Sequence, residues 1–149
     1  TAAATPNGNA FKLALFSSNS ASLGKGTTVY TAPASANAVP TNTLEVSQST
    51  TDGGASNSGY TAGGAALTAS ADPVLSGDTA CVKFNDVSFT SATFTARGCL
   101  LYNNTNISGF NNLRSVFSIN FGADKTVTSG TFTVQFPAQT ASNAIIQID

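Results

Sequence analysis

Apolar and polar residues alternate along most of the chain, and this alternation is the main structural signal in the sequence. In "TFTVQF", residues 131–136, the side chains of Phe132, Val134 and Phe136 fall on one side of an extended backbone. Similar segments are "AFKLALFSS" (10–18), "TTVYTA" (27–32), "GYTAGGAALTAS" (59–70), "PVLSGDTACVKF" (73–84), "FTSATFTARGCLLYNN" (89–104) and "RSVFSINFG" (114–122). Turn residues separate them, and no segment keeps a helical period over three turns. We therefore predict an all-β, single-domain β-sandwich or barrel-like fold, jelly-roll or immunoglobulin-like, with little or no helix.

The apolar positions of these strands predict the core. Its members are Phe11, Leu13, Leu15, Val82, Phe84, Phe94, Leu100, Phe117, Ile119, Phe121, Phe132, Val134 and Phe136. The glycine pair in "GYTAGG" predicts a bulge or a close approach between backbones.

The N-terminal end and one internal stretch differ from this pattern. Residues 1–10 are mostly Ala, Thr, Asn and Gly, which predicts a flexible N-terminal arm. Residues 11–149 form the predicted β domain, with a long loop at 32–58 that carries the short strand "LEVS". Long loops in compact domains are usually functional or mobile, and a disordered insertion is the alternative interpretation.

Charge is scarce and scattered. Charged residues make up 9% of the chain, against a typical value of about 25%. The six Lys and Arg residues form no run, and nucleic acids or anionic membranes need clustered cations, so neither is expected as a partner. A neutral polar surface repels itself little and therefore tolerates close contact with identical copies.

The beginning of the chain carries no basic segment before its apolar residues, and we therefore expect no signal peptide. No apolar run approaches the roughly 20 residues that span a bilayer. Thr1 is consistent with removal of an initiator methionine, so we expect synthesis in a cytoplasm without export.

The residue types of common catalytic sites are missing or dispersed. The chain has no histidine, which excludes Ser-His-Asp and Cys-His catalysis and imidazole ligands. "GKGTT" and "GYTAGG" match neither phosphate-binding glycine motif, and the acidic residues occur singly. We therefore expect a protein that is not an enzyme, with no catalytic, cofactor-binding or metal-binding residues.

The two cysteines are expected to be structural. Alternation places Cys81 with Lys83 and Cys99 with Arg97, both opposite the main apolar face. If their strands form a hairpin, one register sets Cys81 against Cys99, which permits a disulfide, whereas a cytoplasmic origin favours thiols.

Several of these segments together resemble one family. The segments "AFKLALFSS", "GTTVYTA", "SGYTAGGAALT", "TFTARGCLLYNNT" and "FGADKTVTSGTFTVQFPA...NAIIQI" are similar to small structural proteins of tailed double-stranded DNA phages. The resemblance covers most of residues 10–148 and is weakest over 32–58. It implies a virion component, and among virion roles a capsid cement or decoration protein on the capsid surface. The implied partners are the major capsid protein and further copies of this chain, as a homotrimer. The alternative is a tail or tail-fibre component that contacts the host.

A cement role predicts contact segments. Residues 1–10 and the loop 32–58 are expected to order against capsid subunits or a sister copy. Ordering costs backbone entropy, so these segments need apolar groups to bury, and Val39, Leu44 and Val46 are the candidates.

Overall fold

The structure is a computed structural model that describes residues 9–17, 30, 45–46, 59–69, 73–105, 113–144 and 146–148. Its strands are β1 (Phe11–Phe16), β2 (Ala65–Leu67), β3 (Val74–Ser76), β4 (Thr79–Val82), β5 (Val87–Asn103), β6 (Ser115–Val134) and β7 (Ile146–Ile148). No helix in this part of the chain is long and apolar enough to cross a membrane.

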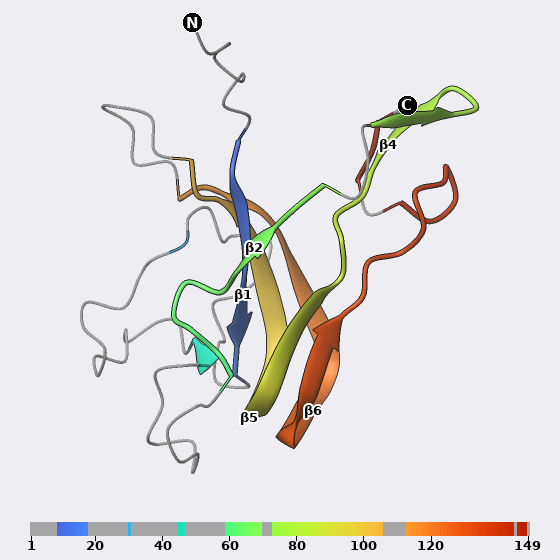
Figure 1. The fold of residues 1–149 in the computed structure, drawn as a ribbon. Helices are drawn as coiled ribbons and strands as arrows, with labels where there is room; N and C mark the ends of the chain where they lie inside the picture. Colours follow the sequence, from blue (N-terminus) through green and yellow to red (C-terminus); the bar gives the residue numbers. More distant parts are fainter. Residues whose placement is uncertain are drawn as a thin grey trace, which may run out of the picture.

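The strands form two antiparallel sheets (Figure 1). The larger sheet has the order β2-β1-β5-β6, and the smaller sheet has the order β3-β4-β7. A bridge between Ala69 and Phe84 connects the segment after β2 with the segment after β4. The prediction of an all-β fold with little or no helix is confirmed for the described residues, and the two antiparallel sheets are compatible with the predicted sandwich.

The long strands β5 and β6 pair as a ribbon that bends back on itself. The register shifts between Phe89 and Ala92, and Ser91 at this point has a positive φ of 51°. On β6, Ser129 has a φ of 48°, and its N–H donates to Thr93 Oγ1 over 2.9 Å. The bend lays the first half of β5 over its second half, as the change from green to yellow along β5 shows in Figure 1.

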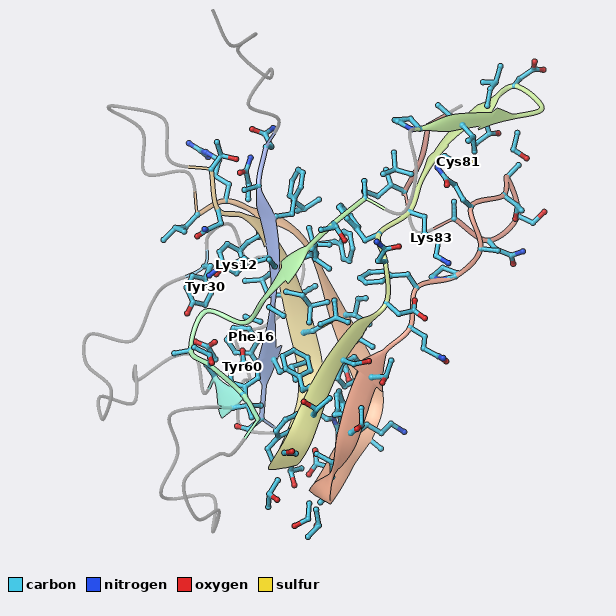
Figure 2. All side chains as sticks on the ribbon, in the orientation of Figure 1. Lys12, Phe16, Tyr30, Tyr60, Cys81 and Lys83 are labelled. Carbon is cyan, nitrogen blue, oxygen red and sulfur yellow. The ribbon has the colours of Figure 1, made fainter. Side chains whose placement is uncertain are left out.

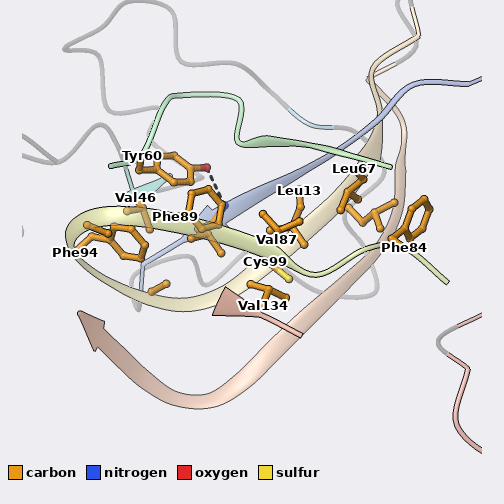
Figure 3. Close-up of a cluster of buried hydrophobic side chains, with 14 of the residues drawn as sticks. Leu13, Val46, Tyr60, Leu67, Phe84, Val87, Phe89, Phe94, Cys99 and Val134 are labelled. Atoms are coloured by element: carbon orange, nitrogen blue, oxygen red, sulfur yellow. Dashed lines mark hydrogen bonds between the residues drawn. The ribbon is translucent and has the colours of Figure 1, made fainter. Parts of the chain in front are cut away.

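The main core lies inside this bend (Figure 3). Rings from both halves of the ribbon meet there: Phe94 lies 5.1 Å from Phe132, and Phe121 lies 6.2 Å from Phe132, between ring centroids. Tyr60 adds a third layer, with its ring centroid 5.3 Å from that of Phe89. Aromatic packing of this kind supplies a large part of the buried apolar area of a small domain.

The predicted core is partly right. Seven of its members are buried: Leu13, Leu15, Phe84, Phe94, Leu100, Val134 and Phe136. Five are only half-buried, although they pack against the core: Phe11, Phe117, Ile119, Phe121 and Phe132. Four of these five lie on β6, and β6 is an edge strand whose outer side has no neighbouring strand among the described residues. Val82 is half-buried and is not part of the main core.

Strict alternation fails along β5. Phe94, Ala96, Cys99 and Leu101 all face the main core, because a register shift between Ala96 and Gly98 reverses the faces. The second cluster lies on the other face and consists of Ala14, Phe16, Tyr30, Leu100 and Tyr102. The centre of the larger sheet is therefore covered on both sides.

The predicted arm and loop lie mainly outside the described residues. In the arm, only positions 9 and 10 are described, and Ala10 is bound to the sheet: its N–H donates to Thr105 Oγ1, and its carbonyl accepts from the Asn104 N–H. Within 32–58, only Glu45 and Val46 are described, and Glu45 forms an antiparallel bridge with Phe16 at the end of β1.

Candidate functional site: a buried carboxylate–tyrosine cluster

The most unusual feature of the described structure is a buried acid. Glu45 is only 2% exposed, although it belongs to a polar stretch of the sequence. Its bridge to Phe16 brings it to the end of β1, and Val46 beside it is buried in the main core. The backbone pairing and the apolar side chain of Val46 thus hold the Glu45 carboxylate in the interior.

Three hydrogen-bond donors surround the Glu45 carboxylate. Tyr30 donates its hydroxyl to Oε2 over 2.7 Å. Tyr60 donates its hydroxyl to Oε1, and the backbone N–H of Gly63 donates to the same oxygen, both over 2.7 Å. Because each partner is a donor, the arrangement matches the acceptor-only pattern of an ionised carboxylate. Short hydrogen bonds to a charged acceptor are stronger than neutral ones, and they compensate for the removal of water.

The hydroxyl of Tyr60 also joins the cluster to β1. It accepts the N–H of Leu15 over 2.9 Å (Figure 3), and it donates to Glu45 over 2.7 Å. The carboxylate is thereby connected through one phenol to the backbone of a central strand.

Tyr102 and Gly63 complete the cluster. Tyr102 donates its hydroxyl to the Gly63 carbonyl over 2.7 Å, so both backbone groups of Gly63 are bonded within the cluster. The ring of Tyr102 stacks on that of Tyr30, with centroids 4.3 Å apart and planes at 9°. Gly64 has a φ of 72°, and a Cβ at this position would overlap the Leu13 carbonyl oxygen. The predicted close approach at the glycine pair is confirmed.

The environment of the cluster disfavours ionisation of its phenols. Burial raises the pKa of Tyr30, Tyr60 and Tyr102 well above the usual value near 10, and the negative charge of Glu45 raises each of them further. The three tyrosines therefore remain neutral hydrogen-bond donors at any physiological pH.

This arrangement holds segments together. Every oxygen of the Glu45 side chain and every tyrosine hydroxyl in the cluster is used in a short internal bond. The bonds join residues 30, 45–46 and 60–63 to β1 and β5 (Figure 2). The cluster is therefore structural: its hydrogen bonds hold Glu45 and Val46, in the middle of the 32–58 segment, on the larger sheet.

Of the three predicted contact residues, the structure describes only Val46. Val46 is 5% exposed and packs in the main core, so its side chain is not offered to a partner in this structure. The reason is its neighbour Glu45, whose bridge to Phe16 holds Val46 against the main core. Val39 and Leu44 lie outside the described residues.

Sequence reasoning did not identify the cluster. Glu45 looks like one of several isolated acids, and Tyr30, Tyr60 and Tyr102 are far apart in the chain. The available signal was a lone acid between two apolar residues, Leu44 and Val46, inside a loop that otherwise contains few apolar residues.

The hairpin that would set Cys81 against Cys99 does not form. Cys81 pairs with Val74 and Gln147 in the smaller sheet, whereas Cys99 pairs with Leu15 and Ile119 in the larger sheet. The chain leaves the smaller sheet after β4, so the strands of the two cysteines never form a hairpin.

Both cysteines are buried free thiols. Cys99 faces the main core, contrary to the prediction, because of the register shift that precedes it. Burial raises the pKa of the Cys99 thiol to about 12. The Cys81 thiol donates to the Thr79 carbonyl over 3.6 Å.

The other ionisable groups are dispersed. In the part of the chain that the structure describes, no three metal-ligating side chains come together. Arg97 and Asp124 form one surface ion pair at 3.4 Å, with side chains 39% and 46% exposed, and a pair of this kind contributes little to stability.

Comparison with models of protein families gave no match to the chain, and comparisons with curated proteins and with solved structures gave none either. The inference about function therefore depends on the residues and on the geometry described above.

Proposed function

We propose that this chain is a non-enzymatic structural protein of a tailed phage particle, most specifically a capsid cement or decoration protein on the capsid surface. It would bind the major capsid protein and stabilise the head by bridging neighbouring capsid subunits. The family resemblance of its sequence motifs supports the virion assignment, and the cluster around Glu45 supports a structural role.

The hydrogen-bonded cluster around Glu45 is the observation that supports the structural role. A protein that bridges subunits must transmit force between its contact segments and its folded domain. The bridge to Phe16 attaches the middle of the 32–58 segment to β1, and three hydrogen bonds join Glu45 to Tyr30, Tyr60 and Gly63 in the interior of the protein. Glu45 and Val46 therefore anchor this segment to the folded domain.

In this proposal, residues 1–8 and the parts of 32–58 that flank Glu45 and Val46 make the contacts with capsid subunits. Val39 and Leu44 are the apolar candidates that remain for burial at those contacts. Three copies in a homotrimer would repeat each modest contact, and each contact after the first forms at a high effective concentration.

The low charge of the chain agrees with a repeated surface protein. With 9% charged residues and a net charge of −1, copies repel one another weakly when they are placed side by side. The second candidate is a tail or tail-fibre component, which the same motifs and composition support equally.

Copy number separates the two candidates. Virions of the phage that encodes the chain are purified, and the protein is quantified against the major capsid protein on a gel. The cement role predicts hundreds of copies per particle and labelling over the head, whereas the tail role predicts tens of copies or fewer. Absence from purified virions would refute both.

Deletion variants test the contact segments. We expect removal of residues 1–8, or shortening of 32–58 with Glu45 and Val46 retained, to lower occupancy on heads while the domain stays folded. Full occupancy by a folded variant would refute the contact mechanism. The emission of the clustered tyrosines reports folding in the same samples.

A further inference from the structure

The outer edge of β6 is unusually open for a folded protein. β6 contains 20 residues and lies at the edge of the larger sheet. Among the described residues, no strand pairs with its outer side. Edge strands are normally protected by charges, prolines or short length, because their unpaired N–H and C=O groups attract other strands. In "FSINF", residues 117–121, there is no charge and no proline.

An open groove lies beside this edge. Its volume is about 460 Å³, and it is lined by Ile119, Phe121, Lys125 and residues 132–135. The groove separates the two layers of the bent ribbon, so the side chains of Phe121 and Phe132 reach solvent there although they pack against the main core. The core of one chain is thus incomplete on the β6 side.

We propose that residues 117–121 of β6 pair antiparallel with the same residues of a second copy of this chain, around a twofold axis at Ile119. The proposal concerns the isolated chain and does not depend on the proposed function.

The sequence of this segment is complementary to itself in that register. Phe117 lies opposite Phe121 of the second copy, and Ile119 lies opposite its counterpart, so the apolar faces coincide. Ser118 lies opposite Asn120 on the other face, so polar side chains also meet polar ones. The charged residues Asp124 and Lys125 lie beyond the paired segment, so no like charges are brought together within it.

The twofold also completes the core. It places the open groove of one copy against that of the other, because both grooves lie at the same edge. The half-buried residues Phe117, Ile119 and Phe121 then gain apolar neighbours across the axis. A sheet edge of a different protein would supply backbone bonds, whereas a second copy also supplies the matching alternation on both faces.

Cysteine cross-linking tests the register. In an antiparallel pair, directly opposite Cα atoms lie about 4.5–5.5 Å apart, within the range of a disulfide, whereas diagonal neighbours lie at roughly 7–8 Å. Ser118→Cys alone and Asn120→Cys alone should therefore not cross-link, whereas a mixture of the two variants should form a disulfide-linked dimer on mild oxidation. The wild-type protein is the control, since Cys81 and Cys99 are buried. Cross-linking of Ser118→Cys to itself, or none in the mixture, would overturn the proposal.

Charge repulsion tests the contact itself. In the double variant Ser118→Lys/Asn120→Lys, each new lysine faces a lysine of the second copy. We expect the mass of the assembly by light scattering to fall by half, from two chains of 15.0 kDa to one, or from six to three if a threefold contact coexists. The matched control is Ser88→Lys/Thr90→Lys, with the same spacing at exposed positions of β5, away from the outer edge of β6, and it should leave the mass unchanged.

Amide exchange distinguishes a second copy from cover by the same chain. The backbone amides of residues 117–121 should be protected in the assembly and exchange faster in the double lysine variant. A wild-type protein with the mass of one chain would overturn the proposal, whether or not those amides are protected.

Discussion

Removal of the Glu45 side chain tests whether the buried cluster stabilises the fold. Glu45→Ala leaves three donors without an acceptor: the hydroxyls of Tyr30 and Tyr60 and the N–H of Gly63. An orphaned buried donor costs about 1–3 kcal/mol, although water that enters the new space recovers part of that free energy. We therefore expect Glu45→Ala to lower the free energy of unfolding by about 3–5 kcal/mol, a large share of the roughly 5–15 kcal/mol of a typical domain.

Glu45→Gln separates the charge from the shape of the side chain. The amide oxygen of glutamine can still accept from Tyr60 and Gly63, and its NH₂ group can face the Tyr30 hydroxyl, which can turn to accept. We expect this variant to lose about 1–2 kcal/mol, clearly less than Glu45→Ala. Asp124→Asn is the matched acid-to-amide control on the surface. It removes only an exposed ion pair at 3.4 Å and should change stability by less than about 1 kcal/mol.

The assay is denaturant unfolding followed by tyrosine fluorescence and by far-UV circular dichroism. The chain has three tyrosines and no tryptophan, and all three tyrosines lie in the cluster, so the emission reports on the cluster alone. Coincident transitions by the two probes would show that the cluster and the sheets unfold together. A loss below about 1 kcal/mol for Glu45→Ala, or equal losses for Glu45→Gln and Asp124→Asn, would refute the reasoning.

Three further predictions concern ionisation, packing and thiols. Because the pKa values of the three tyrosines are raised in the folded protein, the contribution of the neutral phenols to stability is complete below about pH 10 and is lost as the pH rises above it. Phenolate absorbance should therefore appear only with alkaline unfolding. A phenol that titrates near pH 10 in the folded protein would contradict this. Phe94→Ala should lower the free energy of unfolding in denaturant by about 3–5 kcal/mol, and Phe132→Ala should lower it less, since Phe132 lines the open groove beside β6. A larger loss for Phe132→Ala than for Phe94→Ala would show that Phe132 lies in a closed core. Cys81 and Cys99 should react with a thiol reagent slowly in the folded protein and rapidly in denaturant; fast reaction of either in the folded state would show that it is accessible.

The strand content of this protein follows from its sequence alone. Alternation with period two places side chains on opposite faces of an extended chain whatever the strands pair with, so segments such as "TFTVQF" could be recognised directly. The close approach of another backbone at Gly64 was also predictable, because a glycine pair inside a strand pattern leaves room for one. Both predictions rest on local properties, the alternation of side chains and the missing Cβ of glycine, which the sequence shows directly.

The partners of those strands, and the site, depended on the tertiary structure. The register shift between Ala96 and Gly98 reverses the faces of β5, so Cys99 joins the main core and Leu100 the opposite cluster. The pattern of β5 cannot show such a shift, since the three extra residues belong to the neighbouring strand β6. β6 alternates like a central strand, yet its aromatic residues are only half-buried because it lies at an edge. The same limit applies to Glu45, which a sequence presents as one more loop acid. Only the fold brings Tyr30, Tyr60 and Gly63 around it, from positions at least 15 residues away, and the low dielectric of the interior then makes their three hydrogen bonds strong.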